Sequence, residues 1–282
     1  MIETLFDQRS CILGEGPLWH PERNQLFWFD IIDKKMMSRL NSTAFEWQFD
    51  HHVSAAGWIS QEELLIASEV ELFRFNVETR ARAHVIPLEK ENSLTRSNDG
   101  RADPWGGFWI GTMGKNAETE AGAIYRFYHG SVEQLYSEIS IANSICFSPD
   151  KSWAYYTDTV TAQIMRQKLD NEGWPKDKAK VFLDITSERL NPDGSVVDAQ
   201  GFLWNAQWGA SRIARYSPKG NFMKAYDFPA KLTSCPAFGG QDLSELFVTS
   251  ATMGLPSPSK GDGCTYRMPI PFVGQREHQI IL

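Results

Sequence analysis

Short runs of apolar residues, each bounded by turn-forming residues, recur along the whole chain. We find no long segment with the sustained 3.6-residue periodicity of an amphipathic helix, whereas short alternating or apolar runs between turns are typical of β-strands. One such run, ending in a small or acidic residue, occurs six times, at 27–30, 64–68, 108–112, 154–158, 203–206 and 246–250. The pattern predicts an all-β chain.

Each of these runs is followed, after a gap, by a second run that carries an arginine. The six arginines are Arg39, Arg74, Arg126, Arg166, Arg215 and Arg267, which lie 35, 52, 40, 49 and 52 residues apart. This spacing is near the length of a four-stranded propeller blade. We therefore predict a single six-bladed β-propeller domain over residues 1–282, with the arginines at solvent-facing strand positions. A strand near residues 2–6 should complete the last blade, because closure leaves no bare edge.

Composition narrows the classes of partner. The net charge is −7 and no basic run occurs, which argues against nucleic acid as the main partner. No apolar stretch is long enough for a membrane span, and residues 1–5 do not resemble a signal peptide, so a cytoplasmic location is expected. The four cysteines form no Cys-x-x-Cys pair and are expected to be free, buried thiols.

Polar residues occur at blade spacing ahead of the repeated runs. Glu15 and Asn98 lie 83 residues apart, about two units, and the steps from Asn98 to Asn143 and from Asn143 to Asp193 are 45 and 50 residues. A ring brings equivalent positions together on its axis. Two carboxylates and one amide oxygen, from Glu15, Asn143 and Asp193, are ligands that hard divalent cations take. The sequence thus predicts a central metal site, with Ca²⁺ favoured and Zn²⁺, Mg²⁺ or Mn²⁺ as alternatives.

Each of these residues has a simpler interpretation when taken alone. Asp193 stands in Asn-Pro-Asp-Gly, and the residue types of this segment are typical of a tight turn. Asn98 and Asn143 could likewise be turn asparagines, and Arg96 a surface charge. His51 and His52 begin the least polar of the six units and could shape the rim of a pocket.

Several ordered motifs together make the chain recognisable. They are Gly-Glu-Gly-Pro-Leu-Trp at 14–19, Arg-Ser-Asn-Asp-Gly-Arg-Ala-Asp-Pro at 96–104, Trp-Ile-Gly-Thr-Met at 109–113, Pro-Asp-Gly at 192–194, and Thr-Ser-Cys followed by Phe-Gly-Gly within 233–240. With these motifs, over essentially its full length, the chain resembles the SMP-30/gluconolactonase/regucalcin-like family of sugar lactonases.

The resemblance implies a six-bladed propeller that holds one catalytic divalent metal. It gives Glu15, Asn143 and Asp193 the role of metal ligands, makes Asp193 the acid/base as well, and gives Arg96 and Asn98 contacts to the substrate. The expected reaction is metal-assisted hydrolysis of an aldonolactone to the open-chain sugar acid, which makes the protein a carboxylic ester hydrolase of carbohydrate metabolism.

The sequence leaves alternatives for the substrate contact, the functional class and the oligomeric state. Some members of the family carry an acidic sugar contact shortly after Gly-Thr-Met, where this chain has Gly-Lys-Asn, and Lys115 could instead favour an anionic lactone. The alternative to an enzyme is a calcium-binding regulatory propeller or an interaction scaffold, because a fold does not fix a function. The chain is expected to be a monomer or a small homo-oligomer.

Overall fold

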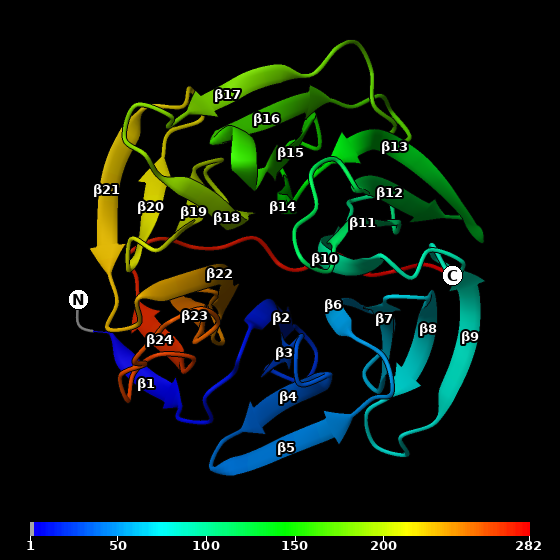
Figure 1. Ribbon diagram of the computed structural model, residues 1–282, viewed down its shortest axis with the longest axis horizontal. Coiled ribbons are helices and arrows are strands. Elements are labelled where there is room, and N and C mark those ends of the chain that lie inside the picture. The colour runs from blue at the N-terminus through cyan, green and yellow to red at the C-terminus, as the bar shows by residue number, and fades with distance from the viewer. Residues whose placement is uncertain (1–2) are drawn as a thin grey trace.

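Six antiparallel sheets of four strands each surround a central axis in the computed structural model, which describes residues 3–282 (Figure 1). In five sheets the strands follow chain order from the centre outward, whereas in the sixth the outermost strand is the first of the chain. The predicted six-bladed β-propeller with four-stranded blades is confirmed.

The strands of each blade are given from the axis outward. The first three blades are β2 (Gly14–His20), β3 (Gln25–Asp30), β4 (Lys35–Leu40), β5 (Thr43–Gln48); β6 (Val53–Trp58), β7 (Glu63–Ser68), β8 (Glu71–Asn76), β9 (Arg82–Pro87); and β10 (Thr95–Ala102), β11 (Phe108–Gly114), β12 (Gly122–Tyr128), β13 (Ser131–Ile139).

The other three are β14 (Ala142–Phe147), β15 (Trp153–Asp158), β16 (Gln163–Lys168), β17 (Lys180–Asp184); β18 (Asn191–Val197), β19 (Leu203–Trp208), β20 (Arg212–Tyr216), β21 (Phe222–Asp227); and β22 (Leu232–Gly239), β23 (Glu245–Ala251), β24 (Thr265–Pro269), β1 (Thr4–Asp7). A short 3₁₀ helix, η1 (Thr159–Thr161), follows β15.

The ring closes as the sequence predicts. Strand β1 pairs antiparallel with β24, so that residues from the two ends of the chain complete one blade; Leu5, for example, lies opposite Tyr266. Ile2, which the prediction also included, lies outside the described residues. A shared last blade couples the stability of the two ends of the chain.

The repeated apolar runs form the second strand of each blade, not the first. They are buried because both faces of the strand pack against neighbouring blades; Trp28, Trp109 and Trp204, one each on β3, β11 and β19, are fully buried. The innermost strand of each blade is therefore the segment that precedes the repeated apolar run in the sequence, where the polar residues at blade spacing lie.

Two of the six recurring arginines contradict the expectation of solvent-facing positions. Arg126 and Arg215 are buried, and each pairs with an aspartate of a neighbouring turn: Arg126 with Asp103 at 2.7 Å and Arg215 with Asp198 at 2.8 Å. The Arg215 guanidinium also lies 3.7 Å from the centre of the Phe202 ring. Burial of these cations is tolerated because a carboxylate and aromatic faces replace water.

The segment after β24 crosses the propeller from the sixth blade toward the second and third (Figure 1). We call residues 273–281 the C-terminal strap. Gln275 donates a hydrogen bond to Val197 O at 2.9 Å, and the Ile280 amide donates to Trp58 O at 2.8 Å. Glu277, whose side chain is only 11% exposed, pairs with Arg101. The strap thereby covers one end of the central channel.

The state of the cysteines and the question of a membrane-spanning helix can also be read from the structure. All four cysteines are free and buried, as predicted. Among residues 3–282 there is no helix with the length and apolar content needed to cross a membrane.

Candidate active site

Four innermost strands carry the five predicted site residues. Glu15 lies on β2, Arg96 and Asn98 on β10, Asn143 on β14 and Asp193 on β18. The structure thus corrects the interpretation of Asp193 as part of a tight turn, because Asn191–Val197 is a strand.

At each of these places the pairing with the next strand slips. The register shifts lie between Glu15 and Leu18 and between Asn143 and Cys146, and similar shifts occur on β10 and β18. Such bulges bend a strand and re-aim its side chains. Here they place polar side chains of four blades at one end of the channel.

Glycine permits the close packing of inner strands at two of these bulges. Gly16 has a φ of +55°, and a Cβ built on it would lie 2.1 Å from Ser54 O. A Cβ on Gly194 would lie 2.3 Å from the Cys235 sulfur of the next blade. The Gly residues that flank Glu15 and Asp193 therefore allow neighbouring blades to approach near the axis.

One cavity of about 170 Å³ brings all five predicted residues together. The sequence did not identify its other lining residues, which are Leu13, Met113, Ala117, Ile141, Thr159, Trp208 and Met253. Only their proximity in the folded ring reveals them, because they come from different blades and most are apolar.

Hydrogen bonds hold the polar side chains of the cavity against one another. Arg96 Nη1 donates to Asn98 Oδ1 at 2.8 Å, and Asn98 Nδ2 donates to Asn143 Oδ1 at 3.1 Å. Asn143 Nδ2 donates in turn to Thr159 Oγ1 at 3.0 Å, and Thr159 donates to Pro192 O at 2.8 Å. This chain fixes the orientation of both amides and links them to the strand of Asp193.

The two carboxylates of the cavity are buried, and the charge of Arg96 acts on Glu15 without direct contact. Glu15 and Asp193 are each 5% exposed, and neither forms an ion pair within residues 3–282. Burial, followed by the charge of Asp99, raises the pKa of Glu15 to about 8. Burial and the charges of Glu15 and Asp99 raise the pKa of Asp193 well above its usual range.

These features fit a divalent cation. A cation with two charges would neutralise both carboxylates, and the Asn143 amide oxygen keeps a second lone pair for it. No group of three or more His, Cys, Asp or Glu side chains suited to a metal occurs in the described part of the chain. The candidate ligand set is therefore two carboxylates and one amide, and water would fill the remaining positions.

Arg96 is the cation of the cavity. Its side chain is 4% exposed, and burial lowers the pKa of its guanidinium to about 10. Its Nε is buried with no hydrogen-bond partner in residues 3–282. This unpaired donor is available to an acceptor oxygen on a bound molecule.

Lys115 and the two histidines are engaged outside the cavity lining. Lys115 Nζ lies 2.6 Å from Glu69 Oε2, and Nδ1 of His52 and of His51 lie 3.1 and 3.3 Å from the same carboxylate. The charge of Lys115 is thus already compensated, which weakens the idea that it attracts an anionic lactone.

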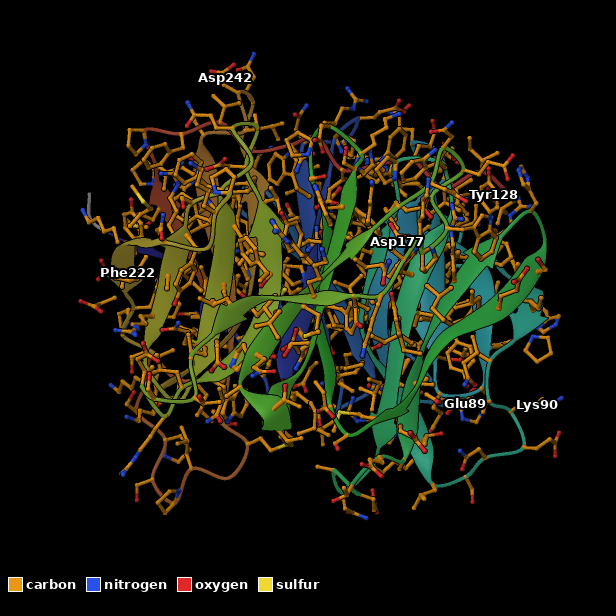
Figure 2. The ribbon with its side chains drawn as sticks, turned by 90° about the horizontal axis from the view of Figure 1, so that it is seen from above. Glu89, Lys90, Tyr128, Asp177, Phe222 and Asp242 are labelled. Carbon is orange, nitrogen blue, oxygen red and sulfur yellow. The ribbon has the colours of Figure 1, made fainter. Side chains whose placement is uncertain are left out.

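The cavity and the C-terminal strap lie at opposite ends of the propeller. Figure 2 shows Glu89 and Asp242 on opposite faces. Glu89 accepts a hydrogen bond from Thr112 on β11, which pairs with the strand of Arg96, whereas Leu243, next to Asp242, accepts one from Gly274 of the strap. The channel is covered at one end and carries the candidate site at the other.

Comparison with known proteins identifies relatives over nearly the whole chain. Residues 13–252 match the model of the SMP-30/Gluconolactonase/LRE-like region. A Rhizobium meliloti (strain 1021) protein provisionally named a sugar lactone lactonase is 38% identical, covering 94% of this chain and 92% of the relative. The L-arabinolactonase of Azospirillum brasilense is 32% identical, covering 92% and 87%.

One solved structure is similar to this chain over nearly its whole length. The calcium-binding protein regucalcin from Agrobacterium tumefaciens str. C58 superposes with a TM-score of 0.96 at 40% identity, covering 99% of this chain and 97% of that one.

Proposed function

The chain belongs to the SMP-30/gluconolactonase/LRE-like family, and we propose that it hydrolyses a sugar lactone to the open-chain sugar acid. The observation that carries the proposal is the convergence of Glu15, Arg96, Asn98, Asn143 and Asp193 in one small cavity. Relatives named as lactonases support it. The reaction places the protein among the carboxylic ester hydrolases.

Glu15, Asn143 and Asp193 are proposed to hold one divalent cation, with Ca²⁺ favoured over Zn²⁺, Mg²⁺ or Mn²⁺. When bound, the cation supplies Lewis acidity toward the lactone carbonyl. The Asn98–Asn143 hydrogen bond orients the amide of Asn143 for this role. Burial of the three side chains excludes bulk water and so strengthens every electrostatic interaction in the cavity.

Asp193 is proposed to move the proton. It takes a proton from the water that attacks the carbonyl carbon, and it returns that proton to the ring oxygen as the ring C–O bond breaks. The backbone carbonyl of Asp193 accepts hydrogen bonds from Ser144 and from Asn205 Nδ2, the latter at 3.0 Å. These bonds fix the backbone from which the carboxylate projects.

Arg96 and Asn98 are proposed to orient the substrate. The unpaired Nε of Arg96 can donate to a lactone oxygen, and Asn98 Oδ1, which already accepts from Arg96, keeps a second lone pair for a hydroxyl. Both side chains are held by neighbouring protein groups before substrate binds. Such preorganisation reduces the entropic cost of placing the ester bond near Asp193.

Hydrolysis of a panel of aldonolactones, followed with a pH indicator, tests the proposal. We expect wild-type activity, and a fall of at least about 100-fold in Asp193→Ala because an acid/base is lost. Asp242→Asn, an exposed change on the opposite face, serves as the control and should retain full activity. Full activity of Asp193→Ala would rule out the assigned role.

A second candidate is a cation-binding propeller without lactonase activity. It is favoured by the description of a solved neighbour as a calcium-binding protein. Stoichiometric cation binding by a protein that hydrolyses none of the lactones would support this candidate against the first.

A further inference from the structure

The wall of the cavity differs in chemistry from its floor. The polar floor consists of Glu15, Arg96, Asn98, Asn143 and Asp193, all of them buried. The apolar part of the lining, which we call the apolar collar, consists of Leu13, Met113, Ile141, Trp208 and Met253. Met253 is 41% exposed and Ile141 and Trp208 are half-buried, so these three mark the mouth.

Most of the polar capacity of the cavity is already used by the protein itself. Both hydrogens of Asn98 Nδ2 are donated, to Ala142 O and to Asn143 Oδ1. Thr159 Oγ1 accepts from Asn143 and donates to Pro192 O. Among the described lining residues, the floor keeps Arg96 Nε and Nη2, one lone pair each on Asn98 Oδ1 and Asn143 Oδ1, and the carboxylates. Toward the mouth, the described lining keeps only one lone pair of Thr159 and the indole N–H of Trp208.

This distribution constrains the substrate. The reacting carbonyl has to lie at the floor, beside Asp193 and Arg96, so the opposite edge of the molecule meets the collar. A hydroxyl placed against Met253 or Ile141 loses water without gaining a partner, whereas a methyl or methylene group gains apolar contact there. A fully hydroxylated sugar lactone therefore suits only half of the cavity.

We propose that the site selects lactones of deoxy sugar acids: rings with hydroxyls beside the carbonyl and a methyl or methylene group at the far end. The inference rests on the proposed lactone hydrolysis and deepens it by naming the substrate class. A volume of about 170 Å³ is below the usual range for drug-sized ligands and suits one small ring.

Matched pairs of lactones test the inference. L-rhamnono-1,4-lactone differs from L-mannono-1,4-lactone only in lacking the 6-hydroxyl, and D-fucono-1,4-lactone differs from D-galactono-1,4-lactone in the same way. We expect kcat/KM to favour the deoxy member of a pair by roughly 10- to 100-fold, the discrimination that an apolar pocket achieves against an added hydroxyl.

The possible outcomes distinguish a failure of the deoxy-sugar preference from a failure of the proposed lactone hydrolysis. Equal or faster hydrolysis of the hydroxylated members would overturn the inference while leaving the lactonase proposal intact. So would a protein that hydrolyses other aldonolactones but neither deoxy lactone. If no lactone of any kind is hydrolysed in the presence of a divalent cation, the proposed function itself is wrong and the inference falls with it.

Two variants test whether the apolar collar causes the preference for deoxy lactones. Met253→Gln keeps the length of the side chain and introduces an amide at the mouth, so it should lower the deoxy preference several-fold. Met223→Gln is the matched control, because Met223 is a similarly exposed methionine on the outermost strand β21. An unchanged preference in Met253→Gln, or an equal change in the control, would overturn the assignment.

Discussion

The ion pair between Arg101 and Glu277 should make the C-terminal strap a stabilising part of the fold. Both side chains are 11% exposed, and the charge of Glu277 helps to raise the pKa of Arg101. Removal of one partner from a buried pair typically costs about 3–5 kcal/mol, because the other charge is left unpaired. Asp99 lies near Arg101 and compensates part of the charge, so we expect the lower end, about 3 kcal/mol, for Glu277→Met.

Unfolding by urea or heat measures this effect. A loss of about 3 kcal/mol lowers the melting temperature by about 5 °C in a chain of this size. The double variant Arg101→Met/Glu277→Met should recover part of the loss, because it removes the charge of Arg101 that Glu277→Met leaves unpaired, while buried Asp99 loses its nearby cation.

A control lies on the same strap. Arg276 pairs with Glu22 at 3.8 Å, but these side chains are 59% and 44% exposed, so Arg276→Met should cost under about 1 kcal/mol. The Arg101–Glu277 pair is not a stabilising contact if Glu277→Met costs no more than Arg276→Met, or if the double variant is less stable than either single one.

Two further predictions follow from other parts of the structure. Burial alone would raise the pKa of Glu69, but hydrogen bonds from Lys115 and His52 outweigh it and lower this pKa to about 2. The ionised carboxylate therefore contributes its full stabilisation above pH 4.5, and this contribution is lost as the pH falls to about 2. Thermal melts across this window should show a shallower pH dependence for Glu69→Gln, and parallel curves would contradict it. Gly194→Ala should destabilise the protein by about 1–3 kcal/mol and reduce lactone turnover, because the new Cβ meets the Cys235 sulfur and displaces Asp193. Unchanged stability and kcat would show that this close approach relaxes without cost.

The fold could be predicted from the sequence because its period is explicit. The spacing of the six arginines reflects one residue per blade, and the register of Glu15, Asn98, Asn143 and Asp193 predicted which side chains share the cavity. The positions of the strands were less accessible, since the bulges interrupt alternation where the site residues lie.

Other features leave no local signal. The apolar collar consists of residues such as Trp208 and Met253, which resemble ordinary core positions until the blades are assembled. The strap has no strand pattern, because it satisfies its hydrogen bonds through isolated contacts with several blades. The buried Arg126 and Arg215 were mistaken for surface residues, because their aspartate partners lie in turns elsewhere in the chain.

The most direct test of the central claim is a titration of divalent cation into chelator-treated protein, with lactone hydrolysis as the readout. If Glu15, Asn143 and Asp193 hold one catalytic cation, hydrolysis stops after chelation and returns to a plateau at one cation per chain. Full activity in the chelated protein, or recovery only beyond one equivalent, would contradict the account.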